Sequence, residues 1–244
     1  MKKASVIKKF LVLNTHRFLF EKIFKPFINL NIKPLALELK KTDRCLVIAP
    51  HPDDECIGCG GIMSLNPKLF DVICLTHGDN SVRSEEFKKA MKLISPNNFG
   101  MLSLKDKDVV SGYNEFKIIP ISEYDYIFVP YIYDQHRDHK AVSILLNRLL
   151  VEKPDMPKKS LKIVFYEVWS TINTPNYFVD ISSVFHKKSL CLAQHRSQNG
   201  ENFAKRIGGL NNYRGMLKDV DYAETFLSME YKDFSSIVQS LISS

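Results

Sequence analysis

The feature that most constrains the fold is an apolar run that stops at a proline. Residues 45–50 read CLVIAP and carry no charged side chain. The next five positions hold one histidine and three acidic residues, His51, Asp53, Asp54 and Glu55. A continuous apolar run of this length is typical of a strand that is buried on both faces. The sequence therefore predicts a buried strand whose carboxyl end presents a polar cluster.

Strand-like and helix-like segments alternate along the rest of the chain. Further strands are expected at residues 70–78, 99–104, 124–133, 161–169 and 176–181. Helices are expected at residues 84–94, 139–153, 182–195 and 222–229, with a short helix within 54–66. This alternation predicts an α/β fold, a three-layer sandwich with a mainly parallel, Rossmann-like sheet. Ligands of such sheets bind beyond the carboxyl ends of the strands.

Two later strands also end in chemically active residues. The strand at 70–78 ends in Thr76, His77, Gly78 and Asp79. The strand at 124–133 is followed by Asp134, His136, Asp138 and His139. Because the carboxyl ends of parallel strands lie along one edge of a sheet, we expect these side chains to meet the cluster at 51–55.

The residue types in this cluster favour a metal site. If the chain turns helical after Pro52, His51 and Asp54 are three positions apart and share one face. An imidazole with a carboxylate suits zinc, and also iron or manganese. A catalytic zinc needs a third protein ligand, and His139 or His136 can supply it.

Asp53 projects differently from its neighbour Asp54 in such a helix. It can stay off the metal and face the bound water, where a carboxylate can serve as general base. Taken alone, this run could be only a capped helix start, since aspartate is favoured there. The second polar cluster, after another strand, favours the metal site.

Charge and cysteine content bound the partners and the compartment. The net charge of +7 favours anionic partners, although a solvated lysine-rich surface explains it equally simply. No signature of a nucleic-acid-binding module accompanies it, so no nucleic-acid partner is expected. Five cysteines, an odd number without framework spacing, indicate a reducing compartment and a cytoplasmic protein.

The N-terminal segment differs in composition from the rest. Residues 1–40 are predicted to be a basic amphipathic extension, and residues 41–244 a single domain. Residues 4–28 can form an amphipathic helix that lies on an anionic membrane surface, or that packs on the domain or on a partner. The apolar runs in it are too short to span a membrane.

Three segments together resemble the PIG-L/LmbE-like family of zinc-dependent N-deacetylases. They are PHPDDE at 50–55, GCGG at 58–61 and HRDH at 136–139. The resemblance covers about residues 44–230 and includes the segments LTHGDNSVRSEEFKKAMKLI and KKSLCLAQHRSQ. The chain departs from the family at Arg137, where proline is common, and this change can alter the loop.

The resemblance implies a role for each motif residue. The metal ligands would be His51, Asp54 and His139. Asp53 would be the general base. His136 would stabilise the tetrahedral intermediate and protonate the leaving amine, Asp138 would orient His136, and Arg83 would contact the substrate.

The activity implied is hydrolysis of the acetamide of an N-acetylated amino-sugar conjugate, releasing acetate and a free amine. The substrate is expected to be a small molecule or a carrier-linked sugar used in cell-surface glycan assembly. Alternatives are a catalytically silent sugar-binding module, an amide hydrolase for a non-sugar substrate, and an adaptor for membrane or nucleic acid. The sequence does not specify the oligomeric state.

Other residues have simpler interpretations. Cys56 and Cys59 form a C-x-x-C pair, but their position favours packing rather than redox chemistry. Tyr166 and Trp169 lie in an expected strand, so we expect both in the core. His195 can line the pocket or interact with a helix end.

Overall fold

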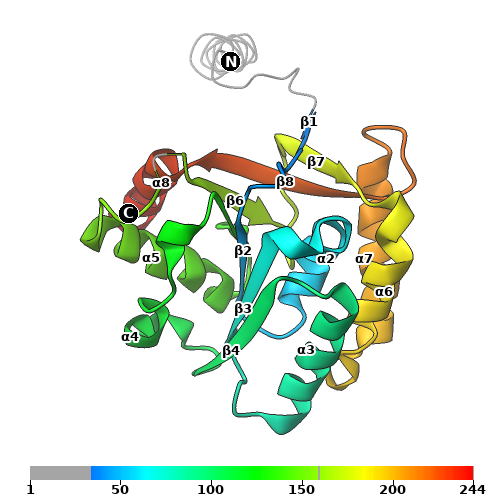
Figure 1. The fold of residues 1–244 in the computed structure, drawn as a ribbon, viewed down its shortest axis with the longest axis horizontal. Coiled ribbons are helices and arrows are strands. Elements are labelled where there is room, and N and C mark those ends of the chain that lie inside the picture. Colours follow the sequence, from blue (N-terminus) through cyan, green and yellow to red (C-terminus); the bar gives the residue numbers. More distant parts are fainter. Residues whose placement is uncertain (1–33, 159, 244) are drawn as a thin grey trace, which may run out of the picture. The chain divides into compact units, whose positions relative to one another are not determined.

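The computed structural model describes residues 34–158 and 160–243, which belong to one compact unit beginning at Pro34 (Figure 1). An eight-stranded sheet runs through it in the order β1-β7-β8-β6-β5-β2-β3-β4. The strands are β1 (Leu35–Ala36), β2 (Cys45–Ala49), β3 (Phe70–Thr76), β4 (Asn98–Leu104), β5 (Tyr126–Pro130), β6 (Lys162–Tyr166), β7 (Tyr177–Asp180) and β8 (Ala223–Glu230).

Helices cover both faces of this sheet. The α-helices are α2 (Asp54–Leu65), α3 (Ser81–Ile94), α4 (Tyr113–Phe116), α5 (Arg137–Glu152), α6 (Phe185–Leu192), α7 (Gly200–Gly215) and α8 (Tyr231–Ser243). Short 3-10 helices lie at Pro67–Leu69, Val109–Ser111, Ile121–Glu123, Ser182–Val184 and Arg196–Gln198. Figure 1 shows α4, α5 and α8 on one side of the sheet and α2, α3, α6 and α7 on the other.

Alternating side chains of the central strand β2 pack into two separate hydrophobic cores, one on each face of the sheet. Leu46 and Ile48 pack with side chains of α5 and α8, whereas Cys45 and Val47 pack with side chains of α2 and α3. Successive residues of a strand point to opposite faces, so one apolar run can serve both layers. The predicted three-layer α/β sandwich is confirmed.

The pairing of the strands is mainly parallel, as expected. Strands β2 to β6 pair in parallel with one another, and β1 pairs in parallel with β7. Only β8, of the strands that the structure describes, pairs antiparallel, with β6 on one side and β7 on the other. The carboxyl ends of β2, β3 and β5 therefore lie along the same edge.

The helix expected at residues 222–229 is wrong, because this segment is β8. Alanine, glutamate, leucine and methionine favour a helix in isolation, but the segment is hydrogen-bonded between two strands and mostly buried. Tertiary pairing overrides such weak local preferences. Helices α7 and α8, which flank this region, were not predicted.

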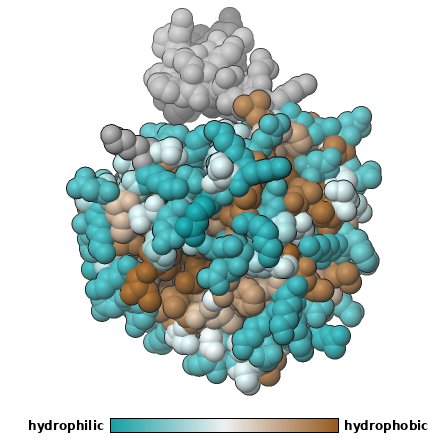
Figure 2. All heavy atoms as spheres, viewed as in Figure 1, coloured by the Kyte–Doolittle hydropathy of each residue, from teal (hydrophilic) through white to brown (hydrophobic). Residues whose placement is uncertain are grey.

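The predicted amphipathic helix at residues 4–28, and most of the predicted extension 1–40, lie outside the described residues. The described part starts beside β1, which pairs with β7. Across the described ranges, the helices are each too short or too polar to cross a bilayer. Figure 2 shows that hydrophilic side chains cover most of one face, with small apolar patches between them.

Helix α2 lies unusually close to the sheet, and its glycines permit this approach. A Cβ atom on Gly58 would lie 2.1 Å from Cδ2 of Tyr166. The Tyr166 ring cannot retreat easily, because it is fully buried and its hydroxyl donates to the Ile48 carbonyl at 2.9 Å. Close packing at Gly58 therefore holds the start of α2 against the strand ends.

We expect Gly58→Ala to lower the free energy of unfolding by about 1–3 kcal/mol, because a filled core resists an added methyl group. The matched control is Gly209→Ala in α7, where no atom lies within 4 Å of the new Cβ. That change should raise the free energy of unfolding by about 0.5–1 kcal/mol through helix propensity. Urea denaturation measures both, and shifts of the same sign would contradict the packing argument.

Candidate active site

Polar side chains from several loops surround one cavity at the carboxyl edge of the sheet. The cavity has a volume of about 330 Å³. Its lining residues are His51, Asp53, Asp54, Arg83, Asp106, Lys107, His136, Trp169 and Gln198. The segments after β2, β4 and β5 supply most of the titratable groups, as parallel strand ends predict.

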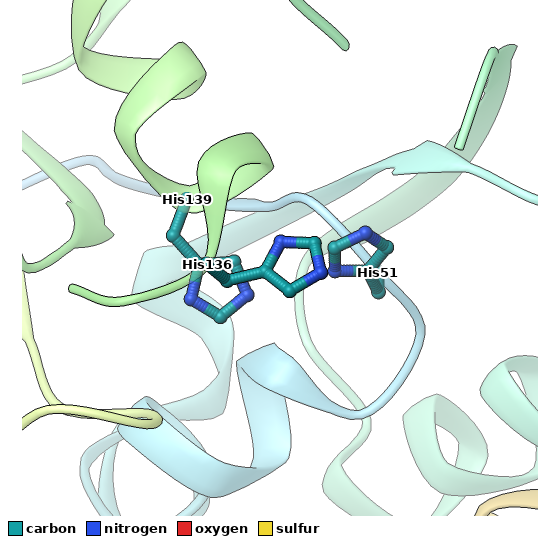
Figure 3. Close-up of side chains that lie close together, drawn as sticks. All are labelled: His51, His136 and His139. Carbon is teal, nitrogen blue, oxygen red and sulfur yellow. The ribbon is translucent and has the colours of Figure 1, made fainter. Parts of the chain in front are cut away.

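Three imidazoles meet beside this cavity. Figure 3 shows His136 and His139 at the start of α5, facing His51 in the loop after β2. One nitrogen from each ring lies within 4.8 Å of the others. The polar cluster at residues 51–55 and the one after β5 therefore lie together in space, as the sequence predicted.

The carboxylate of Asp54 lies between two of these rings. Its Oδ2 atom is 3.1 Å from Nδ1 of His51 and 3.3 Å from Nε2 of His139. Ligand atoms of a tetrahedral zinc ion sit about 2.0–2.2 Å from it and therefore about 3.3–3.6 Å from one another, close to the separations found here. The donor set of two imidazoles and one carboxylate thus fits a small divalent ion.

A helix begins after Pro52, as expected, but His51 lies outside it, so His51 and Asp54 do not share a helical face. Helix α2 begins at Asp54, and Asp53 occupies the cap position with φ 123° and ψ −31°. His51 and Asp54 converge because Asp54 Oδ2 also accepts the His51 backbone N–H at 3.0 Å. The first helical residue is Asp54, and the strained Asp53 precedes it at the cap position.

Strain at Asp53 is consistent with a functional position. A positive φ of this size is rare for a residue with a Cβ, and such outliers cost about 1–3 kcal/mol. The Asp53 carboxylate lines the cavity and lies 3.8 Å from Nη2 of Arg83. Burial, reinforced by the neighbouring charge of Asp54, raises the pKa of Asp53 to about 7.

Acidic neighbours raise the pKa of two of the three imidazoles, His51 and His139. Burial alone would lower the pKa of His51, but Asp138 and Asp54 raise it to about 10. Burial is likewise outweighed at His139, where Asp54 and Asp134 raise the pKa to about 9. Burial acts to raise the pKa of Asp54, but these two histidines hold it far below its usual range.

Asp134 was noted at a strand end, but no role was predicted for it. It is fully buried, and its Oδ1 atom lies 3.0 Å from Nδ1 of His139. Its carboxylate also accepts the backbone N–H groups of His136, Trp169 and Ser170. A carboxylate behind the outer nitrogen of an imidazole is the usual arrangement for a metal-binding histidine. Its position two residues before the HRDH segment is the signal that could have found it.

The contacts of Asp138 differ from those implied by the resemblance. Its carboxylate lies 3.3 Å from Nε2 of His51 and accepts the backbone N–H of Lys107 at 2.7 Å. The link to His136 runs through the backbone, because the Asp138 N–H donates to Nδ1 of His136 at 3.2 Å. Asp138 therefore fixes the orientation of His51 by its side chain and that of His136 by its amide.

Arg83 reaches the site from α3. Its Nη2 atom donates to the Pro52 carbonyl at 2.7 Å, and its Nη1 atom lies 3.3 Å from Nε2 of His77. His77, expected at a strand end, meets Arg83 and also lies beside His51, with ring centroids 6.3 Å apart. The substrate contact that the resemblance implies for Arg83 stays a prediction.

Of the two aromatic residues expected in the core, one is buried and the other is exposed. Tyr166 is fully buried, as predicted. Trp169 is 50% exposed and lines the cavity, so the core assignment is wrong for it. Strand β6 ends at Tyr166, and Trp169 therefore lies in the loop beyond the carboxyl end of that strand. Its ring packs edge-on against Phe203 with centroids 5.7 Å apart.

Cys56, Cys59 and His195 lie behind the site. All five cysteines are free and buried, and Cys56 and Cys59 sit in the core around α2. His195 is fully buried and lies 3.6 Å from a carboxylate oxygen of Glu55. It does not line the cavity.

Known proteins share this sequence pattern and fold. The family described as PIG-L: GlcNAc-PI de-N-acetylase matches residues 46–149. A probable N-acetyl-alpha-D-glucosaminyl L-malate deacetylase 2 from Bacillus subtilis (strain 168) is 27% identical, over 64% of this chain and 83% of its own.

Solved structures agree on the architecture. The conserved protein TT1542 from Thermus thermophilus superposes with a TM-score of 0.65 at 22% identity, over 76% of this chain and 94% of its own. The N,N'-diacetylchitobiose deacetylase from Pyrococcus horikoshii gives 0.63 at 22% identity, over 89% and 92%. At this identity, the likeness shows the fold. Over residues 46–149 the chain is therefore similar to the PIG-L family, and its fold is that of the solved structures.

Proposed function

We propose that this protein is a metal-dependent N-deacetylase that hydrolyses the acetamide of an N-acetylated amino-sugar conjugate. The observation that carries the proposal is the convergence of two imidazoles and a carboxylate beside the strained Asp53 in one cavity. A binding module for sugars does not need a second, off-metal carboxylate at this position. The names of the Bacillus and Pyrococcus relatives support the substrate class.

His51, Asp54 and His139 are the proposed ligands of the ion, for which zinc is favoured over iron or manganese. A zinc ion held there would polarise the acetamide carbonyl and lower the pKa of a water molecule towards about 7. The protein's contribution is to hold these donors in place. Asp134 fixes His139, and Asp138 fixes His51.

Asp53 is the proposed general base. Its carboxylate faces the cavity and accepts a proton from the attacking water. Burial and the charge of Asp54 raise the pKa of Asp53 to about 7, whereas a dication beside it favours the ionised form. After the tetrahedral intermediate forms, Asp53 returns this proton to the leaving nitrogen.

His136 is the proposed donor to the oxyanion. Its Nδ1 atom accepts the Asp138 N–H, so the proton of the neutral ring lies on Nε2. Burial, together with the charges of His51 and His139, lowers the pKa of His136 and keeps it neutral. A neutral ring serves as a hydrogen-bond donor and not as an acid, so protonation of the leaving amine falls to Asp53.

Trp169 is the proposed platform for the sugar ring. Half of its surface is exposed at the cavity, and Phe203 supports its edge. An aromatic face exposed beside a polar cavity can stack on the apolar face of a sugar. The finer assignment, a carrier-linked sugar for cell-surface glycan assembly, rests on the net charge of +7 and on the N-terminal composition.

We expect Asp53→Ala to reduce amine release from a panel of N-acetylated sugar donors by about 10²–10⁴-fold, because the general base is lost. Metal content should stay at the wild-type level, since Asp53 is off the ion. The control is Asp233→Ala, an exposed aspartate on α8, which should leave the rate unchanged. Equal rates for wild type and Asp53→Ala on every donor would overturn the mechanism.

We expect zinc affinity to rise with pH from about 6 to about 9, because bound zinc displaces protons from its ligands. His51 and His139 have pKa values raised to about 10 and about 9, so both carry a proton at neutral pH. The stability that these protonated rings provide is fully present below about pH 6.5 and is lost as the pH rises from there through about 9 and 10. Calorimetric titration in two buffers of different ionisation enthalpy measures the protons released, and zero release would contradict the assignment.

We expect Trp169→Ala to raise KM for sugar donors by about 2–12-fold, the range that corresponds to an aromatic contact of about 0.5–1.5 kcal/mol. Trp169→Phe should recover most of the loss, while kcat changes less than twofold in both variants. Tyr133→Ala, at an aromatic that is 56% exposed outside the cavity lining, serves as control. Unchanged KM in Trp169→Ala would remove the stacking role.

A further inference from the structure

A buried acid and a buried imidazole lie directly behind the catalytic aspartate. Glu55, in the first turn of α2, and His195, which follows α6, are both 0% exposed. Oε1 of Glu55 lies 3.6 Å from Nε2 of His195 and accepts the thiol of Cys56 at 3.2 Å. Neither residue lines the cavity, so neither can touch the substrate. A fully buried carboxylate is costly to keep unless it is paired and hydrogen-bonded.

The second oxygen of Glu55 binds the backbone of Asp53. Oε2 accepts the Asp53 N–H at 3.1 Å. This N–H belongs to the peptide group that links Pro52 and Asp53, and the carbonyl of the same group accepts Nη2 of Arg83 at 2.7 Å. The peptide group is therefore held at both ends by side chains of opposite charge.

Fixing this peptide group fixes the direction of the Asp53 side chain. The φ angle of Asp53, 123°, is the rotation that follows this group along the chain. On the other side, the Asp53 carbonyl accepts the N–H groups of Cys56 and Ile57 at 3.0 and 2.9 Å. All backbone polar groups around Asp53 are thus bonded, and only its carboxylate remains directed at the cavity.

His195 lies beside Glu55 in the buried layer behind the site. Its imidazole nitrogens have no hydrogen bond within the described part of the chain, and Glu55 is the carboxylate beside them. The loop that follows is tied to α3, because Ser197 donates to Glu86 from its amide at 2.8 Å and from its hydroxyl at 2.6 Å. The carbonyl of His195 also accepts the amides of Gln198 and Gly200 at 3.0 Å each. The backbone that places His195 beside Glu55 is therefore held by hydrogen bonds.

We propose that Glu55 is a positioning residue for the deacetylation, holding Asp53 in its strained, productive conformation with His195 as its buried partner. This inference rests on the proposed function for its effect on rate. It assigns a role to the last acid of the PHPDDE segment, for which the sequence analysis predicted none. Small misplacements of a reacting group lower rates strongly, so the hydrogen bond to the Asp53 amide is expected to control kcat.

Two conservative variants of Glu55 distinguish the effect of side-chain length from the effect of side-chain charge. Glu55→Gln keeps the length of the side chain and an oxygen that can accept the Asp53 N–H. Glu55→Asp keeps the charge beside His195 but is one methylene shorter and cannot reach that N–H. We expect kcat for Glu55→Gln within about threefold of wild type and kcat for Glu55→Asp lowered by about 10–100-fold. KM and a metal content of one ion per chain should be unchanged in both.

Amide exchange gives a readout independent of turnover. In Glu55→Asp the Asp53 N–H loses its acceptor, so peptides covering residues 50–56 should exchange hydrogen for deuterium faster than in wild type. Glu55→Gln should retain protection. This measurement still tests the inference if no donor in the panel is hydrolysed by wild type, a result that would overturn only the proposed function.

The matched control is Glu224→Gln. Glu224 is also a buried carboxylate that accepts amides of α2, from Gly61 and Ile62 at 2.7 and 2.9 Å, and it contacts the buried Lys188. Its substitution should lower stability and leave kcat and exchange at 50–56 unchanged. Equal or reversed kcat losses in Glu55→Gln and Glu55→Asp would overturn the proposal. So would two ions per wild-type chain with one lost in Glu55→Asp, because Glu55, Cys56 and His195 would then be metal ligands.

Discussion

The site depends on placing carboxylates between imidazoles where water has little access. Asp54 bridges His51 and His139, and Asp134 and Asp138 back the same two rings from behind. Unpaired, any of these buried charges would be strongly unfavourable. In this cluster the negative charge of the acids can be balanced by protons on the imidazoles or by a divalent ion. A divalent ion that binds here would replace those protons. The structure keeps this cluster at the end of a rigid sheet, where the donors need not rearrange.

The sequence predicted which edge of the sheet carries the site, and which polar residues lie there, for a physical reason. A strand buried on both faces must be apolar, so the change from CLVIAP to HPDDE marks the point where the chain leaves the core. Parallel strands align such points, which is why His51 and His139 could be paired across a long stretch of chain. The family match over residues 46–149 agrees with this reading.

What could not be read depends on tertiary context. Residues 222–229 have helical composition but pair as β8, because strands on both sides provide their hydrogen bonds. Trp169 follows a strand in sequence, and only the end of β6 at Tyr166 shows that it leaves the core. The positive φ of Asp53 also has no sequence signature, since aspartate is equally common at ordinary helix caps.

The way Asp134 is bonded bears on how a site of this kind can diversify. One carboxylate supports the imidazole of His139 and, at the same time, anchors the loop that carries Trp169. Asp134 binds this loop through main-chain amides, so these hydrogen bonds do not depend on the identity of the loop's side chains. Side chains of this loop can therefore be substituted without changing the hydrogen bonds that Asp134 makes to the loop. The specificity of the site can then change while the arrangement around His139 stays the same.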